Sequence, residues 1–193
     1  AVSSDFQPDT DYTMEAHIYV DPNPTNNANI IFSTRDNNAG GAGQTGGWWF
    51  VSQGTGLNFV GWNEPAGVSN NTVVTLVNNY VPEYGSPTRL TYGEWHHVAA
   101  TRDTSGSPVT WRTFVDGRLH QEGPENDNGI LADVNEGLSI GREVTDTTRD
   151  FHGNIDNVRI TKGVCRYTEN FTPPKAPYPN YKKRGPATSI AQS

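Results

Sequence analysis

Short stretches in which apolar and polar residues alternate recur along the chain, and this period of two is the pattern of half-buried β-strands. The two clearest stretches are residues 12–20 and 94–102. In the second, Trp95 and His97 share one face, whereas Val98 and Ala100 share the other. We expect further strands at residues 29–33, 48–52, 57–62, 72–78, 109–115, 118–122, 138–141 and 153–161.

Turn signals separate these stretches. Gly54-Thr55-Gly56 and Asp116-Gly117 each stand between two expected strands, where tight hairpins favour such residues. No stretch of useful length shows the 3.6-residue apolar period of an amphipathic helix. Short strands without helices predict an all-β fold, either a β-sandwich or a jelly roll.

The composition agrees with many strands joined by turns. Hydrophobic residues make up 33% of the chain, and there are 20 glycines and 13 prolines. Charged residues make up 18%, which argues against a highly charged disordered chain. No apolar run approaches the length of a membrane span and no signal peptide is recognised, so we expect no membrane insertion.

The formal net charge is -7, and its distribution along the chain is uneven. Residues 175–193 contain only basic charged residues, so the excess of acidic residues lies in the rest of the chain. Phosphate contacts need clustered cations. We therefore exclude nucleic acid as a partner.

The character of the sequence changes after residue 174. We expect residues 1–174 to form the sandwich and residues 175–193 to form an extended, basic, proline-rich C-terminal arm. The alternative is a tail that stays in solvent. If the arm is an assembly device, its contacts to a neighbouring copy or another protein would come from Tyr178, Tyr181, Lys182, Lys183 and Arg184.

Four motifs follow one another in the order of a known family. They are residues 94–102 (EWHHVAATR), 114–117 (FVDG), 138–142 (LSIGR) and 151–160 (FHGNIDNVRI). Together they resemble laminin-G-like jelly-roll domains of the concanavalin A-like lectin/glucanase superfamily. The resemblance implies two curved antiparallel sheets.

The end of the chain carries a more specific resemblance. Residues 160–174 (ITKGVCRYTENFTPP) are similar to the C-terminal signature of the subgroup that is common in virion proteins of tailed bacteriophages. This implies a place on a phage particle, at the virion surface or otherwise outside the cell. Members usually have alanine where this chain has Cys165, its only cysteine, which favours a small buried position over a reactive thiol.

The chain departs from the family pattern at its start. Family domains generally carry another strand before the one expected at residues 12–20, and here only residues 1–11 precede it. That strand either lies upstream of this sequence or is supplied by another chain. A missing strand would leave an open sheet edge, which proteins usually cover.

Catalysis has no recognisable machinery in this sequence. Glycoside hydrolases of the superfamily use acids at alternating positions of one strand, written Glu-x-Asp-x-Glu, and this triplet is absent. Asp9 and Asp11 precede the first strand, whereas Glu125 and Asp127 lie in an expected loop. No nucleophile motif is found. We therefore expect a protein that is not an enzyme.

Calcium is the one metal for which the family gives a reason, because laminin-G-like domains often hold it at the rim of the sandwich. The segment Glu125-x-Asp127-x-Gly129, with Glu136 beyond it, only superficially resembles a calcium loop. Asp156 is another candidate, unless it accepts backbone hydrogen bonds. The five histidines show no zinc-binding spacing. We expect no cofactor, with a structural calcium as the alternative.

A sugar site would need aromatic platforms beside amide and carboxylate groups. Such groups are supplied by Trp49, Trp62, Asn63 and Glu64. One ring of the Trp48-Trp49 pair must face away from the core, because successive side chains of a strand point to opposite faces. The alternative is that both of these rings are buried. We assign Trp95 and Trp111 to the core.

These observations leave three functions in order of preference. The first is a structural or adhesive component of a phage virion, as head decoration, tail or fibre, which assembles through its terminal segments with other virion proteins or copies of itself. The second is a free-standing carbohydrate-binding module, whose ligand could be a host-surface glycan. The third and weakest is a glycoside hydrolase.

Overall fold

The computed structural model describes residues 4–22, 28–34, 47–62, 72–76, 88–126, 137–143 and 149–175, and of Trp62 and residues 72–75 it describes the backbone alone. The elements in chain order are the 3-10 helix η1 (Ser4–Phe6) and the strands β1 (Tyr12–Val20), β2 (Ala28–Ser33), β3 (Gly47–Gln53), β4 (Gly56–Trp62), β5 (Thr72–Leu76), β6 (Trp95–Asp103), β7 (Thr110–Val115), β8 (Arg118–Pro124), β9 (Ser139–Ile140) and β10 (Gly153–Lys162).

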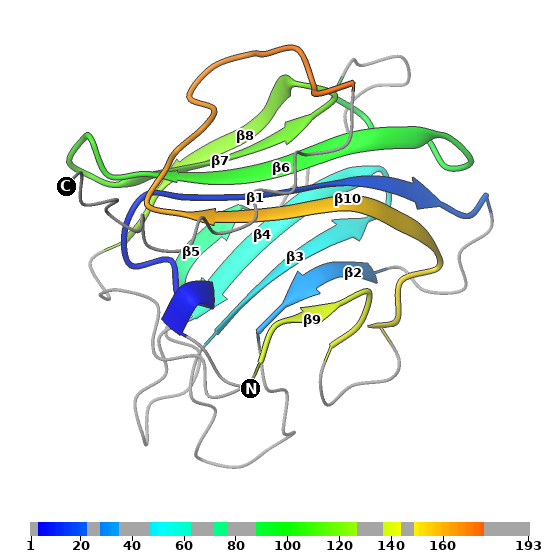
Figure 1. The fold of residues 1–193 in the computed structure, drawn as a ribbon, viewed down its shortest axis with the longest axis horizontal. Coiled ribbons are helices and arrows are strands. Elements are labelled where there is room, and N and C mark those ends of the chain that lie inside the picture. Colours follow the sequence, from blue (N-terminus) through cyan, green and yellow to red (C-terminus); the bar gives the residue numbers. More distant parts are fainter. Residues whose placement is uncertain are drawn as a thin grey trace, which may run out of the picture.

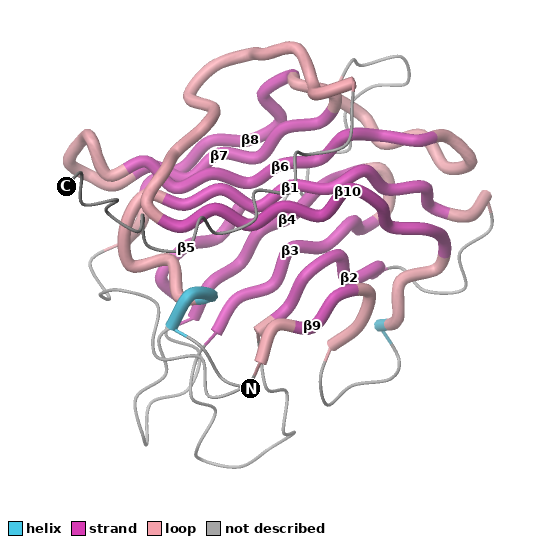
Figure 2. The backbone as a smooth tube through the Cα atoms, viewed as in Figure 1, coloured by secondary structure: helices cyan, strands magenta, loops and turns pink. Residues whose placement is uncertain are grey.

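The strands form two sheets that pack face to face, as Figures 1 and 2 show. Within the described residues, the first sheet has the order β10-β1-β6-β7-β8 and the second has the order β5-β4-β3-β2-β9. All neighbouring strands run antiparallel. The predicted all-β, two-sheet sandwich is therefore confirmed. No helix in the described part of the chain has the length and hydropathy of a membrane span.

Strand β1 lies inside the first sheet and not at its edge. It pairs with β6 on one side and with β10, the last strand in the sequence, on the other. The described edges of this sheet are consequently β10 and β8. The chain itself thus supplies both neighbours of its first strand.

The core is made by the side chains that point between the sheets, and it is rich in aromatic rings. Phe59 of β4 and Trp111 of β7 stack across the sandwich with ring centroids 4.2 Å apart. Trp48 is also fully buried, and its indole N–H donates to the backbone oxygen of Phe6 at 2.9 Å. Burying each such ring contributes about 2–3 kcal/mol. The predicted core position of Trp111 is confirmed.

The alternation along β6 separates core from surface at the predicted positions, with one correction. Val98 and Ala100 belong to the core, whereas the opposite face of β6 points away from it. Trp95 lies on that outer face and is 51% exposed, so its assignment to the core was wrong. The reason is that Trp95 begins the strand, beyond the part of the outer face that other residues cover.

The predicted hairpin at Asp116-Gly117 is confirmed. The two residues have φ angles of 49° and 73°, as a two-residue type I′ turn requires, and they join β7 to β8. The hairpin at Gly54-Thr55-Gly56 is confirmed as the connection between β3 and β4.

After β10 the chain crosses the outer face of the first sheet as a segment that we call the strap (residues 163–175), drawn in orange in Figure 1. Polar contacts attach it to the sheet strand by strand. Thr13 of β1 donates to the Val164 oxygen at 2.8 Å, and Thr101 of β6 donates to the Tyr167 oxygen at 2.9 Å. Phe171 then donates its amide to the Gly117 oxygen at 2.8 Å.

A small aromatic cluster lies between the strap and the outer face of the sheet. Tyr167 and Phe171 stack with their ring centroids 3.5 Å apart, and Phe114 of β7 meets Phe171 edge to face at 5.4 Å. Cys165 is half-buried beside them, and burial raises the pKa of its thiol. The C-terminal motif of the sequence is therefore a structural part of the sandwich surface.

Candidate ligand-binding site

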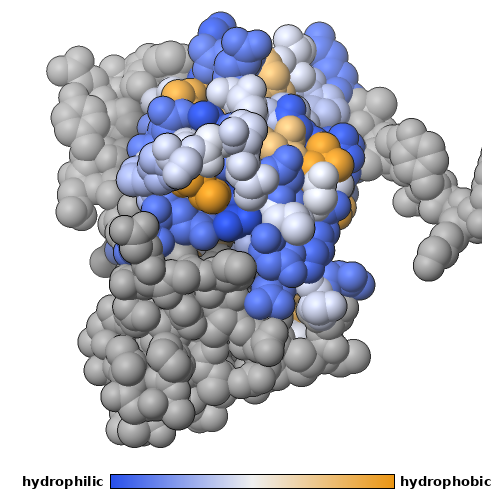
Figure 3. Space-filling model, turned by 90° about the vertical axis from the view of Figure 1, so that its left-hand side faces the viewer, coloured by the Kyte–Doolittle hydropathy of each residue, from blue (hydrophilic) through white to orange (hydrophobic). Residues whose placement is uncertain are grey.

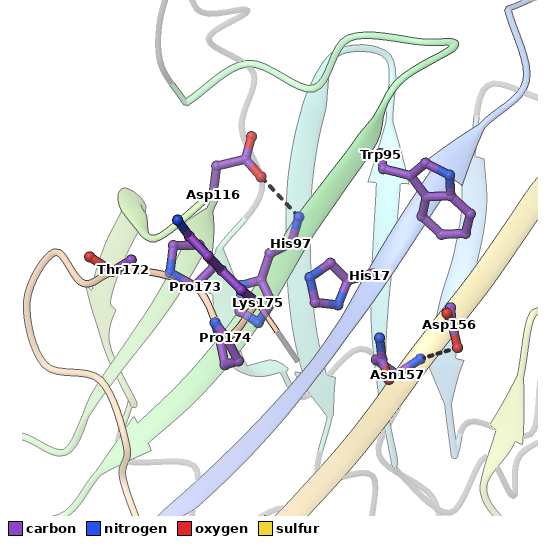
Figure 4. Close-up of a pocket in the computed structure, with 10 residues that line it drawn as sticks. All are labelled: His17, Trp95, His97, Asp116, Asp156, Asn157, Thr172, Pro173, Pro174 and Lys175. Carbon is purple, nitrogen blue, oxygen red and sulfur yellow. Dashed lines mark hydrogen bonds between the residues drawn. The ribbon is translucent and has the colours of Figure 1, made fainter. Parts of the chain in front are cut away.

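A pocket of about 540 Å³ opens on the outer face of the first sheet, where the strap ends. Figure 4 shows the side chains that surround it. The sheet contributes His17, Trp95, His97, Asp156 and Asn157, the β7–β8 turn contributes Asp116, and the strap contributes residues 172–175.

The register of three strands brings the floor of the pocket together. His17 of β1 stands directly opposite His97 of β6 on one side and Asp156 of β10 on the other. The rings of His17 and His97 meet edge to face, with centroids 5.1 Å apart. In the next row Tyr19 stands opposite Trp95, with ring centroids 5.8 Å apart. Residues far apart in sequence thus form one continuous surface.

A β-bulge in β10 shapes one end of the pocket. The pairing of β1 with β10 shifts register between Glu15 and His17. At this place Asn157 adopts a φ of 48°, in the left-handed region. Successive side chains of a regular strand point to opposite faces, but here both Asp156 and Asn157 line the pocket. The backbone N–H of Asn157 donates to Asp156 Oδ1 at 2.7 Å.

A buried carboxylate lies behind the pocket and fastens the strap. Glu15 is fully buried and accepts hydrogen bonds from Arg159 at 2.6 Å and from the Tyr167 hydroxyl at 2.9 Å, and its Oε2 lies 3.1 Å from His97 Nε2. Burial alone would raise the pKa of Glu15, but the hydrogen bonds from His97, Arg159 and Tyr167 outweigh it and lower the pKa. Glu15 therefore stays ionised and couples the strap to the wall of the pocket.

Asp116 is held by the backbone and side chains of β6. Its Oδ2 lies 2.7 Å from His96 Nδ1, and its Oδ1 accepts the His97 amide at 2.9 Å. Although burial opposes it, the bond to His96 lowers the pKa of Asp116. Both carboxylate oxygens are thus engaged within the protein, so Asp116 mainly fixes the turn beside the pocket.

His17 is a neutral group at the pocket floor. Burial is the first cause that lowers its pKa, and the neighbouring His97 adds to it. Its Nδ1 atom is buried and has no hydrogen-bond partner among the described residues. His17 therefore lines the pocket as an uncharged ring.

Of the four predicted sugar-binding side chains, the structure describes that of Trp49, which does not line this pocket. Trp49 is half-buried on β3 in the other sheet, and the Arg149 guanidinium covers its ring at 5.0 Å from the centroid. Trp62 belongs to β4, but its side chain, like Asn63 and Glu64, lies outside the described residues. Their role stays a prediction. The same holds for the proposed assembly contacts Tyr178, Tyr181, Lys182, Lys183 and Arg184 and for the domain boundary after residue 174.

Of the residues in the expected calcium loop, Glu125 lies within the described part of the chain. Glu125 accepts hydrogen bonds from Arg102 and from the Trp111 indole, at 2.7 and 2.8 Å, and so serves a structural ion pair. Asp127, Gly129 and Glu136 lie outside the described residues. Among the residues that are described, no three histidines, cysteines or acids are grouped to hold a metal ion.

Most of the pocket was not foreseen from the sequence. The alternation along residues 94–102 placed Trp95 beside His97, and this signal could have marked Trp95 as an outer residue. The histidine at position 17 and the pair Asp156-Asn157 carried no comparable signal, because their meeting depends on strand register and on a bulge.

Comparisons with known proteins agree with the architecture. A family model described as the concanavalin A-like lectin/glucanases superfamily matches residues 1–169. Among curated proteins, none matches the sequence.

Two solved structures share the fold at low sequence identity. One is the CBM40 of an IT-sialidase from Ruminococcus gnavus, bound to α2,3-sialyllactose, with a TM-score of 0.57 and 12% identity over 81% of this chain and 77% of that one. The other is a protein from Bacteroides ovatus whose description proposes carbohydrate binding, with a TM-score of 0.51 and 21% identity over 82% of this chain. This chain covers only 38% of the length of the Bacteroides protein.

Proposed function

Because the chain belongs to the concanavalin A-like lectin/glucanase superfamily, we propose that it is a carbohydrate-binding module whose ligand occupies the pocket beside Trp95. The two structural relatives support this class of ligand, since one is bound to a sugar and the other is described as a carbohydrate binder. Their identity to this chain is too low to carry over a site, so the location rests on the geometry of the pocket.

The exposed indole of Trp95 is the observation that carries the proposal. At 51% exposure it is the most exposed large hydrophobic residue of the described part of the chain. On the face seen in Figure 3, the described residues are mainly hydrophilic, with small and separate hydrophobic patches. A flat apolar ring beside a carboxylate, a carboxamide and an imidazole matches a sugar, which has an apolar face and a hydroxyl-bearing edge.

A glycan array followed by calorimetry on the best ligand tests the proposal. Trp95→Ala should weaken binding about 30-fold or more, as expected when a central aromatic contact is lost. Leu119→Ala is the matched control, because Leu119 is also exposed, at 37%, but does not line the pocket. If no glycan binds the full chain, or if both variants bind alike, the pocket is not a sugar site.

The role on a phage particle remains a second proposal. It rests on the motif at residues 160–174, which forms the end of β10 and most of the strap. We also propose that the protein is located at a virion surface, that it assembles with virion proteins and that it has no enzymatic activity. Light scattering on the chain with and without the arm, residues 175–193, would test self-assembly through it.

A further inference from the structure

The β-bulge in β10 places two polar side chains where a regular strand would place one. Asp156 pairs with His17 and Arg159 pairs with Glu15, so Asn157 and Val158 stand opposite the single residue Ala16. The extra residue lets Asn157 line the pocket next to Asp156. The left-handed φ of 48° at Asn157 disfavours most residues, although asparagine tolerates it better than others. Strained backbone of this kind gathers at ligand sites.

The two side chains offer complementary hydrogen-bonding groups. An ionised carboxylate only accepts, whereas a carboxamide both donates and accepts. Asp156 Oδ1 accepts a hydrogen bond from the backbone N–H of Asn157. Its Oδ2 has no hydrogen-bond partner among the described residues. Two neighbouring hydroxyl groups of a sugar could donate to Asp156 and accept from Asn157. The ring of His17 lines the pocket beside them.

The charges around the pocket disfavour an acidic ligand at this end. Among the residues that the structure describes, no arginine lines it, and the nearest arginine on the same strand, Arg159, is bound to Glu15 and Tyr167. Arginine is the residue best suited to bind a carboxylate in a bidentate way. Of the described residues, the lining cation other than histidine is Lys175, which belongs to the strap, whereas Asp156 belongs to the opposite wall on β10.

We propose that the pocket binds a neutral sugar unit through two neighbouring hydroxyl groups and that the Asp156 carboxylate discriminates against sugars that carry a carboxylate or sulfate. Asp156 and Asn157 are then the specificity-determining residues, and Trp95 supplies affinity without regard to charge. This inference rests on the proposed carbohydrate-binding function.

Binding of matched neutral and acidic glycans to the full chain tests the proposal. The probes are an array of neutral glycans with their sialylated, uronic or sulfated counterparts, including lactose and α2,3-sialyllactose. For the neutral core that binds best, the acidic counterpart should bind roughly tenfold more weakly. Asp156→Asn should reduce that ratio to about threefold or less, because the shape is kept and the charge is lost.

Two further variants serve as controls. One separates the effect of the Asn157 carboxamide from that of its backbone conformation, and the other separates the effect of the Asp156 charge from that of overall charge. Asn157→Gly keeps a residue that accepts the positive φ but removes the carboxamide, so it should weaken the neutral glycan about tenfold. Glu169→Gln is the charge control, because Glu169 is exposed on the strap and does not line the pocket. It should change neither affinity nor the ratio by more than about twofold.

Four results would overturn the inference, and one of them also removes its basis. If no glycan on the array binds, the carbohydrate function itself fails. If neutral and acidic partners bind equally, or if Asp156→Asn leaves their ratio unchanged, sugar binding stands but the charge selection is wrong. If acidic glycans bind better and Lys175→Ala abolishes that preference, Lys175 and not Asp156 sets the specificity.

Discussion

Gly117 lies directly beneath the backbone of Phe171: its carbonyl oxygen accepts the Phe171 amide at 2.8 Å, and a Cβ atom on it would stand 2.0 Å from the Phe171 oxygen. At this point the turn between β7 and β8 meets the strap main chain to main chain. A side chain at position 117 would push the strap away from the sheet, and the strap forms one wall of the pocket.

Gly117→Ala should lower the free energy of unfolding by about 3 kcal/mol, because it combines a steric clash with a φ of 73°. Urea denaturation measures this. Gly163→Ala is the matched control, since Gly163 has a φ of 83° but nothing lies within 4 Å of its added Cβ. The control should lose only about 1 kcal/mol, and equal losses would show that the contact with Phe171 is unimportant.

Glu15→Gln should destabilise the fold by about 3 kcal/mol, because it leaves Arg159 next to a neutral group in a buried site. Denaturant unfolding at pH 7 is the measurement. Glu122→Gln removes an acid from the exposed pair with Arg112 and should cost less than about 1 kcal/mol. A loss in Glu15→Gln no larger than in this control would mean that the network does not fasten the strap.

Stability should fall as the pH drops from about 6.5 towards 4, in part through His120. Burial lowers the pKa of His120 to about 4, so the unfolded chain, with its ordinary histidine, binds the proton first in this range. Protonation thus favours unfolding, on the order of 2 kcal/mol by pH 4.5. Comparing unfolding at pH 7 and 4.5 tests this.

His120→Gln is the variant for that test, since glutamine can still accept the Leu57 amide that His120 Nε2 accepts at 3.1 Å. The variant should lose less stability between pH 7 and pH 4.5 than the wild-type chain does. An unchanged pH dependence would show that other groups account for the acid sensitivity.

Trp49→Ala should leave glycan affinity within about twofold while lowering stability. Its ring lies on the second sheet and is covered by Arg149, which in turn binds Glu143 at 3.0 Å. Loss of the cation–π contact and of ring burial should cost about 2 kcal/mol or more. Calorimetry with the best array ligand, together with thermal unfolding, separates the two effects. A variant that folds but no longer binds would restore the site first expected at Trp49.

The sandwich could be predicted because its signals are local. Alternation located the strands, and Asp116-Gly117 identified a hairpin whose φ angles the structure confirms. The pairing of β1 with both β6 and β10 joins segments from the two ends of the chain, and no local pattern announces it.

The pocket could not be predicted for the same physical reason. Its floor needs His17, His97 and Asp156 in one cross-strand row, and a shift of one position would turn each side chain to the other face. The alternation along β6 did place Trp95 on the outer face, but large aromatic residues are usually buried, and this expectation misplaced the ring that matters most.

The position of β1 inside the sheet, between β10 and β6, also bears on how the protein is made. Thr13 of β1 hydrogen-bonds to Val164, which is synthesised 151 positions later. At a synthesis rate of about 5–20 residues per second, β1 leaves the ribosome on the order of ten seconds before its last partners. Until then one edge of β1 has no strand to pair with, because that edge pairs with β10. A ribosome that stalls before β10 would therefore display an incomplete sheet, and co-translational chaperones would be expected to act on the nascent chain during that interval.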